Sequence, residues 1–162
     1  NYAYLDTDER TMFSTGSQNM LMTQVQKSIG SKSKIQELNF NHPLNYFAAG
    51  KSSAIGVLNK ANKLKLQING TDISDYKFAD PHFTSVPLYY HTTNSSVKGD
   101  QLLFIPFCLD AAKLQPTGTL NFSRLDSARI QSTGQDFDED IYAVNYNVLR
   151  IENGMGGLLY SN

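Results

Sequence analysis

The chain has 162 residues, which is enough for one domain with a sizeable hydrophobic core. Its 14 Lys and Arg nearly balance 15 Asp and Glu, so the charge indicates neither a nucleic-acid surface nor a basic membrane-binding face. No apolar run approaches the roughly 20 residues of a membrane span, and we expect no direct membrane insertion. The single cysteine, Cys108, lies in an apolar run and is expected to be a buried thiol. Because Asn1 is not a methionine, we expect the chain to start inside a longer protein or after processing.

One short helix is expected near the N-terminus. Asp6 is followed three residues later by Glu9, which is typical of a capping box, and the helix is expected to close at Gly16. Within the first 50 residues, four other short segments either alternate apolar and polar residues or are largely apolar between polar turns. They predict strands at residues 2–5, 20–25, 34–40 and 44–49.

The clearest alternation runs from residue 63 to residue 68, with Leu64 and Leu66 on one face and lysines on the other. It ends in Asn69-Gly70, which predicts a type I′ hairpin turn. Residues 76–90 are expected to form a loop with a helical turn.

Further strands are expected in the C-terminal half. Residues 102–109 are apolar on both faces and predict a buried central strand, in which Pro106 indicates a bulge or an edge position. Residues 141–151 alternate after the acidic connection DFDED, and residues 158–160 predict a final short strand.

The segment PTGTLNFSRLDSARI, residues 116–130, begins with turn residues and continues as an alternating run. Phe122 points one way and Asn121 the other, which predicts a half-buried strand. Arg124 and Asp126 lie on the same face of that strand, so we expect Arg124 to pair with Asp126 or with a neighbouring acid.

About eight short strands separated by turns and accompanied by one short helix indicate an all-β sandwich or barrel. The long connections between strands favour an eight-stranded antiparallel jelly-roll sandwich over a simple meander.

The chemical motifs of the sequence are weak. His42, His82 and His91 lack the close spacing of a metal site, and no nucleophile motif G-x-S-x-G occurs, so we expect no metal, no cofactor and no catalytic residues. Two other classes of function stay open. Tyr89, Tyr90 and His91 are able to form a sugar platform of a jelly-roll carbohydrate-binding module, and a cupin-type metalloenzyme is the third alternative.

Three glycosylation sequons begin at Asn69, Asn94 and Asn121. Asn69 is expected to be used by its turn and Asn121 by its strand, which leaves Asn94 in the polar segment TTNSS as the candidate glycosylation site.

Five phrases, in order along the chain, resemble the major capsid proteins of nucleocytoplasmic large DNA viruses, the group that includes iridoviruses, phycodnaviruses and mimivirus relatives. They are YLDTDER with MLMTQVQ, LNFNHP, LQINGTD, PTGTLNFSRLDSA and YAVNYNVLRIENGMGGLLYSN. The resemblance implies a double jelly roll, three copies of which form a pseudo-hexameric capsomer of an icosahedral shell. The first jelly roll has no counterpart in this sequence. Residues 1–162 are therefore expected to be a single domain, the C-terminal jelly roll and second half of a longer, non-enzymatic virion protein.

The resemblance also implies the partners and the location. We expect homotrimers, neighbouring capsomers and minor capsid proteins as partners, no nucleic acid, and a place in the virion capsid after assembly in the host cytoplasm. Twelve residues are expected to fix strand ends, to form subunit contacts or to let backbones approach closely: Pro116, Gly118, Asn121, Phe122, Ser123, Arg124, Asp126, Asn145, Asn147, Gly154, Gly156 and Gly157.

Overall fold

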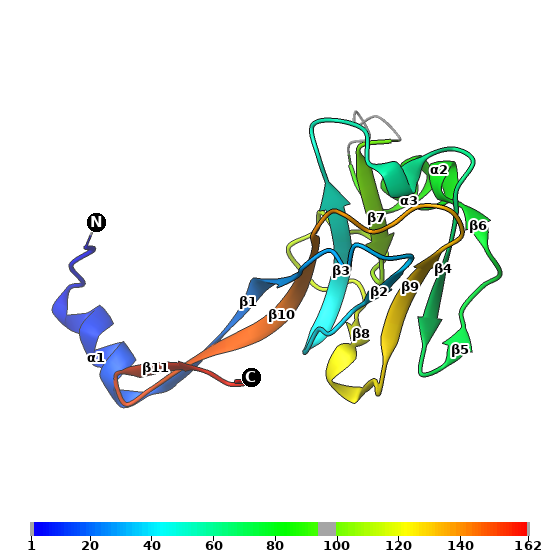
Figure 1. Cartoon of the computed structure of the whole chain (residues 1–162). Coiled ribbons are helices and arrows are strands. Elements are labelled where there is room, and N and C mark those ends of the chain that lie inside the picture. The colour runs from blue at the N-terminus through cyan, green and yellow to red at the C-terminus, as the bar shows by residue number, and fades with distance from the viewer. Residues whose placement is uncertain (1, 94–99, 162) are drawn as a thin grey trace. The chain divides into compact units, whose positions relative to one another are not determined.

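The computed structural model describes residues 2–93 and 100–161 (Figure 1). The chain divides into two compact units, one of Val25–Asn145 and the other of Asn1–Gln24 with Tyr146–Asn162. We call the second the terminal unit.

The described residues form mostly strands. The strands are β1 (Ser17–Ser28), β2 (Ile35–Glu37), β3 (Pro43–Gly50), β4 (Lys63–Ile68), β5 (Thr71–Asp72), β6 (Lys77–Phe78), β7 (Leu102–Pro106), β8 (Leu120–Asn121), β9 (Ala128–Ser132), β10 (Ile141–Glu152) and β11 (Met155–Leu158). The helices are α1 (Thr7–Thr15), α2 (Ala79–His82) and α3 (Ser85–His91), and two 3-10 turns are η1 (Gly56–Leu58) and η2 (Phe122–Arg124).

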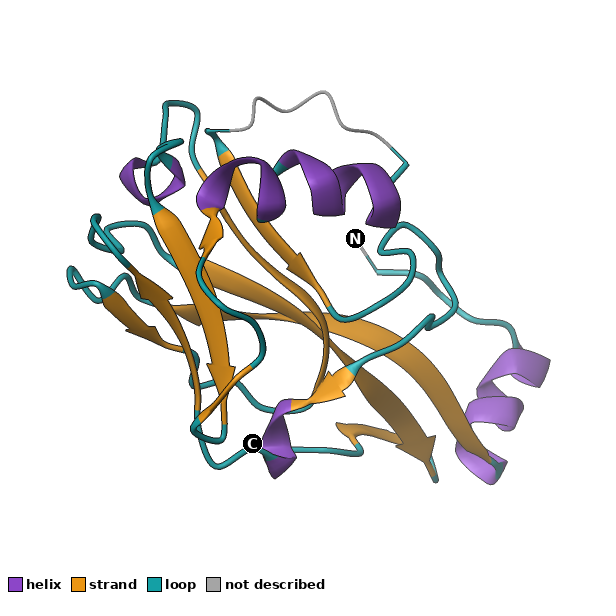
Figure 2. Cartoon of the chain, turned by 90° about the vertical axis from the view of Figure 1, so that its right-hand side faces the viewer, coloured by secondary structure: helices purple, strands orange, loops and turns teal. Residues whose placement is uncertain are grey.

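The strands form two sheets, which Figure 2 shows in orange. One sheet has the order β1-β10-β3-β7, with β8 beside β3 and β11 beside β10, and the other has the order β2-β9-β4-β5, with β6 beside β4. The pairing is nested, because β1 lies beside β10, β2 beside β9, β3 beside β7 and β4 beside β5. One long antiparallel hairpin rolled into two sheets gives this order, which is that of a jelly roll. The predicted all-β jelly-roll class is therefore confirmed.

The core of the Val25–Asn145 unit lies between the inner faces of these sheets. Phe47 of β3, Leu64 of β4, Ile130 of β9 and Ile141 of β10 are fully buried. The predicted alternation of β4 is confirmed, because every second residue of its first half faces this core. Burial of each such side chain contributes about 1.5–3 kcal/mol, so the inward faces hold the sheets together.

Two local predictions about turns and caps are also confirmed. Asn69 and Gly70 have φ values of 50° and 77°, as a type I′ turn between β4 and β5 requires. At the start of α1, Asp6 accepts a hydrogen bond from the N–H of Glu9 at 2.9 Å, and the Glu9 carboxylate accepts one from the Asp6 N–H.

Other predictions about the elements are wrong. Residues 2–5 form no strand. Residues 76–90 contain β6, all of α2 and most of α3, so the expected helical turn is present, but the expectation that the N-terminal helix is the only one is wrong. The strand predicted at residues 102–109 ends at Pro106 and is the outermost of its sheet among the described residues, so the central position is wrong and the edge position that Pro106 indicated is right. The N–H of Phe104 donates to the carbonyl of Phe83 instead of to another strand. None of the helices in the described residues is long and apolar enough to span a membrane.

Candidate assembly surfaces

The segment around Phe122 is a clamped turn rather than a continuous strand. The strand β8 ends at Asn121, whose side-chain oxygen accepts a hydrogen bond from the Ser123 N–H at 3.1 Å and caps η2. The hydroxyl of Ser123 accepts a hydrogen bond from the N–H of His42 at 2.8 Å. Because the Asn121 side chain offers the backbone a local partner, the chain turns here, and the predicted strand is wrong beyond Asn121. Phe122 nevertheless enters the core, with 3% of its surface exposed.

A loop closes immediately before this turn. The Thr117 hydroxyl donates to the carbonyl of Asp110 and accepts from the Asp110 N–H, both at 3.0 Å. Gly118 has a φ of 142°, and a Cβ added there would lie 3.1 Å from the carbonyl oxygen of Phe107. A close backbone approach therefore explains this glycine, while Pro116 is exposed beside it.

The expected ion pair between Arg124 and Asp126 does not form. Both side chains are exposed, and neither makes an ion pair with another residue that the structure describes. Arg124 lies in η2, so the alternation that placed it beside Asp126 does not hold. The backbone N–H groups of Asp126 and Ser127 donate instead to the side-chain oxygen of Asn69, at 2.8 and 3.2 Å.

Asn145 fixes an irregularity inside the sheet. The register between β10 and β3 shifts between Val144 and Asn145, and Asn145 is fully buried. Its side-chain oxygen accepts a hydrogen bond from the Gln26 side-chain nitrogen at 3.0 Å. The Gln26 side chain also donates to the carbonyl of Asn41 and accepts from the Asn41 N–H. A buried polar side chain at such a bulge stabilises one register, since any slip would leave it unpaired.

Asn147 has a comparable role within the terminal unit. Its side-chain nitrogen donates to the side-chain oxygen of Gln24 at 3.0 Å and to the carbonyl of Tyr160 at 2.8 Å. Its oxygen accepts from the N–H of Val148 at 2.7 Å. Asn145 and Asn147 thus bond inside the chain, and their expected part in subunit contacts stays a prediction.

The glycines after β10 differ in their roles. Asn153 and Gly154 have φ values of 52° and 77° and form the turn between β10 and β11. Our reading of the sequence missed this second Asn-Gly hairpin signal. A Cβ added at Gly154 or Gly157 would meet nothing within 4 Å, and one at Gly156 would lie 3.9 Å from the Ile151 side chain. The expected close approach of backbones at these glycines is therefore not found among the described residues.

The acidic connection DFDED, residues 136–140, joins the start of β10 to other segments through ion pairs. Asp140 lies 2.6 Å from the ammonium of Lys27 and accepts a hydrogen bond from the Gly30 N–H at 3.0 Å. The hydrogen bond to Lys27 is the main cause that lowers the pKa of Asp140. A Cβ added at Gly30 would lie 2.7 Å from the carbonyl oxygen of Asp138, so no larger residue fits there without a shift. A second pair joins Lys51 to Glu139 at 2.5 Å.

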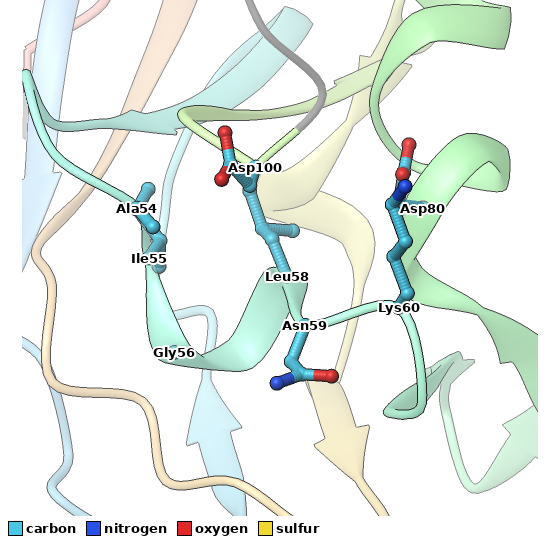
Figure 3. Close-up of a pocket in the computed structure, with 8 residues that line it drawn as sticks. All are labelled: Ala54, Ile55, Gly56, Leu58, Asn59, Lys60, Asp80 and Asp100. Carbon is cyan, nitrogen blue, oxygen red and sulfur yellow. The ribbon is translucent and has the colours of Figure 1, made fainter.

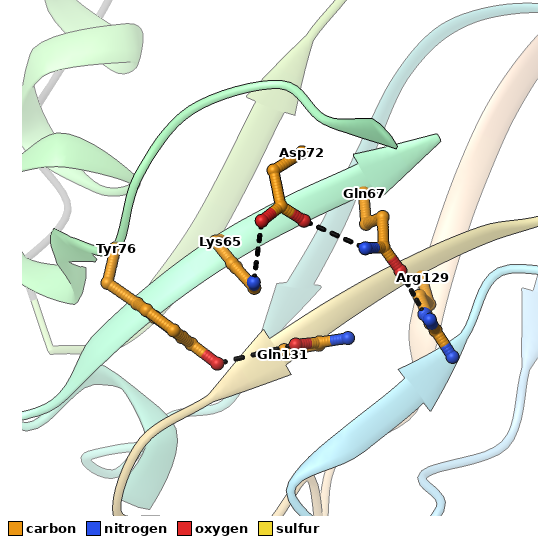
Figure 4. Close-up of polar contacts among 6 residues, drawn as sticks. All are labelled: Lys65, Gln67, Asp72, Tyr76, Arg129 and Gln131. Atoms are coloured by element: carbon orange, nitrogen blue, oxygen red, sulfur yellow. Dashed lines mark hydrogen bonds and ion pairs between the residues drawn. The ribbon is translucent and has the colours of Figure 1, made fainter. Parts of the chain in front are cut away.

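The outer face of the second sheet carries a chain of polar contacts (Figure 4). Asp72 lies 2.8 Å from the ammonium of Lys65 and accepts a hydrogen bond from the Gln67 amide, whose oxygen accepts one from Arg129. The hydrogen bond between Lys65 and Asp72 is the main cause that raises the pKa of Lys65 and lowers that of Asp72. These contacts join β4, β5 and β9 across the outer face of the sheet.

A hollow of about 570 Å³ lies beside η1 (Figure 3). Lys60, Asp80 and Asp100 supply its charges, and Asp80 accepts a hydrogen bond from the Thr84 hydroxyl at 2.7 Å. Nowhere in residues 2–93 and 100–161 do three His, Cys, Asp or Glu side chains gather as metal ligands would.

The aromatic residues of α3 do not form one flat platform. Tyr89 and Tyr90 are each 71% exposed, but their rings stand at 90° to each other. His91 has its Nδ1 atom 3.1 Å from the carbonyl oxygen of Leu109. The candidate glycosylation site Asn94 lies outside the described residues.

The comparisons with known proteins agree with this jelly-roll topology. The sequence profile of the family described as large eukaryotic DNA virus major capsid protein matches residues 9–157. The chain belongs to this family. The resemblance inferred from the five phrases is therefore confirmed.

Two major capsid proteins illustrate the relationship. That of Pyramimonas orientalis virus is 34% identical over 193 aligned residues, covering 100% of this chain and 48% of the relative. That of Paramecium bursaria Chlorella virus 1 is 29% identical, covering 100% of this chain and 53% of the relative. The chain thus spans about half the length of these major capsid proteins.

Solved structures show the same relationship in three dimensions. A quasi-atomic model of the PBCV-1 virus capsid superimposes with a TM-score of 0.73 and 26% identity, over 98% of this chain and 55% of that one. The Faustovirus major capsid protein has a TM-score of 0.55 at 12% identity, over 89% of this chain and 35% of that one, and supports the fold alone.

Proposed function

We propose that the chain is the C-terminal jelly roll of a major capsid protein, and that its function is structural. The observation that carries this proposal is the nested jelly-roll pairing in a chain that belongs to the capsid family. In the complete protein a second jelly roll stands beside this one, and three copies form a pseudo-hexameric capsomer of an icosahedral shell.

The polar contacts support a structural role. Hydrogen-bonded side chains at Asn121, Asn145 and Asn147 fix turns and register, and ion pairs fasten the acidic connection and the outer sheet face. A shell protein needs such rigidity rather than a cleft with a tuned acid or base. Arg124 and Asp126, exposed and unpaired among the described residues, are the side chains we assign to contacts with a neighbouring subunit.

The partners in this proposal are further copies of the same protein and minor capsid proteins, and the site of assembly is the host cytoplasm. Native mass measurement and electron microscopy of the full-length protein test it. We expect trimers and ordered lattices, whereas a strictly monomeric full-length protein that turns over a small molecule would refute it.

A further inference from the structure

A hollow of about 260 Å³ lies between α3 and the outermost strand β7, within the Val25–Asn145 unit. Three of the residues that line it are buried apolar side chains, Phe83, Phe104 and Ile105, each at most 8% exposed. The N–H of Phe104 donates to the carbonyl of Phe83 at 2.9 Å, which fastens the segment between α2 and α3 to the edge of β7. The hollow is therefore formed before any ligand binds, as is usual for small-molecule sites.

Three polar side chains line the same hollow: Tyr90, His82 and His91. The Nδ1 atom of His91 lies 3.1 Å from the carbonyl oxygen of Leu109, and the Ala111 N–H donates to the His91 carbonyl at 2.8 Å. Because a carbonyl oxygen only accepts, Nδ1 carries the proton, and Nε2 of the neutral ring is left as an acceptor. The Tyr90 hydroxyl both donates and accepts. The hollow thus combines apolar surface with polar groups, one of which is held by the loop after β7.

The size and polarity of the hollow narrow the class of ligand. Pockets for drug-sized ligands measure about 300–1,000 Å³, so a hollow of about 260 Å³ suits a smaller molecule. None of the described residues that line it is Lys, Arg, Asp or Glu, which favours a neutral ligand over a phosphate or a carboxylate. A purely apolar ligand would displace water and leave the polar side chains without partners, at a cost in free energy.

A sugar matches both kinds of surface. A pyranose ring has an apolar C–H face that packs on aromatic rings, and its hydroxyl groups both donate and accept hydrogen bonds. We propose that the hollow between α3 and β7 binds one neutral pyranose ring of a glycan. A glycan site is additional to the structural role, so this inference does not rest on the proposed function.

The two neighbouring tyrosines indicate a single ring rather than a long sugar chain. Tyr89 and Tyr90 are each 71% exposed, with ring centres 5.1 Å apart and ring planes at 90°. Perpendicular rings cannot both lie flat against one extended chain, and of the two only Tyr90 lines the hollow. Tyr90 therefore supplies the aromatic wall for the C–H face of the sugar, and the two histidines are available to its hydroxyl groups.

Saturation-transfer difference NMR on the full-length capsid protein tests the proposal. The probes are the methyl glycosides of glucose, galactose and mannose, together with N-acetylglucosamine. We expect the ring protons of at least one probe to receive saturation, and Tyr90→Ala to weaken its binding by about fivefold to tenfold, the loss of one aromatic contact. The matched control Tyr89→Ala removes an equally exposed ring outside the hollow and should leave binding unchanged. Thermal melts check that both variants fold.

Three results would overturn the proposal. Absence of saturation for every probe with the wild-type protein would refute a sugar site. Equal binding by the wild type and Tyr90→Ala, or equal losses in the two variants, would place sugar binding elsewhere. Tighter binding of phenol than of any sugar probe, lost in Tyr90→Ala, would identify an aromatic ligand as the occupant. Trimer and lattice formation are measured separately on the same protein, so failure of the sugar site leaves the proposed function standing.

Discussion

Truncation of Phe122 tests whether η2 anchors the jelly-roll core. The ring of Phe122 lies 5.6 Å from that of Phe107 and 6.1 Å from that of Phe40, and only 3% of the residue is exposed. Replacing such a buried ring by a methyl group costs about 3–5 kcal/mol, because transfer free energy is lost and a cavity remains. We expect Phe122→Ala to lower the free energy of unfolding by about 4 kcal/mol, a large part of the roughly 5–15 kcal/mol typical of a domain.

Urea titration followed by far-ultraviolet circular dichroism measures this change, since the chain has no Trp to report unfolding. A loss of this size lowers the melting temperature by about 8–16 °C in a domain of this length. Phe78→Ala is the matched control, because Phe78 is 51% exposed, and we expect a loss below about 1 kcal/mol.

A loss below about 1 kcal/mol for Phe122→Ala, at an unchanged dependence on urea, would refute the reasoning. Such a result would mean that η2 does not hold this ring in the core. The hydrogen bonds from Ser123 to Asn121 and from His42 to Ser123 would then not stabilise the fold in the way we describe.

Substitutions at three further positions, Gly30, Asn69 and Asp140, test the turns and the acidic connection. Gly30→Ala should lower the free energy of unfolding, measured by urea titration, by about 1–3 kcal/mol, because its Cβ would lie 2.7 Å from a backbone oxygen. The control Gly157→Ala, where a Cβ meets nothing within 4 Å, should change it by no more than about 0.5 kcal/mol. Asn69→Gly removes the side-chain hydrogen bonds to the backbone of Asp126 and Ser127 and should lower the free energy of unfolding by about 1–3 kcal/mol. Asn69→Ala should lower it by roughly 1–2 kcal/mol more, because the φ of 50° is unfavourable for alanine. Equal losses for the two variants would contradict a role for φ. The pKa of the Asp140 carboxyl is lowered in the folded state. Its contribution to folding stability is therefore fully present above the unfolded pKa of about 3.9, and it is lost as the pH falls through the lower folded pKa. Asp140→Asn should therefore flatten stability against pH in this acid range, and an unchanged slope in thermal melts would show that the pair with Lys27 is not coupled to folding.

The sequence predicted those elements whose signals are local. The capping box at Asp6 and the hairpin at Asn69-Gly70 depend on residues a few positions apart, so their physics is visible in the sequence. The alternation of β4 is equally clear, since one face of the strand is buried and the other is solvated. The order of the strands is not local, and the sequence did not predict it.

The predictions failed where a side chain offered the backbone an alternative partner. At Asn121 the alternating pattern continues through Phe122, yet the amide oxygen caps η2, and the strand ends. Alternation alone cannot separate a strand from a 3-10 turn here, because both place Phe122 inward. The contacts of Asn145 with Gln26 and of Asn147 with Gln24 join residues more than 100 positions apart, so spacing in the sequence gives no sign of them.

The shifted pKa values follow the ion pairs and the burial of the fold. Among the described residues, the raised lysine pKa values belong to Lys27, Lys51 and Lys65, and each is explained first by a hydrogen bond to a carboxylate on another segment. Burial raises the pKa of Cys108 and of Tyr46, which keeps both groups protonated and unreactive at neutral pH. Charge in this chain therefore fastens strands and loops.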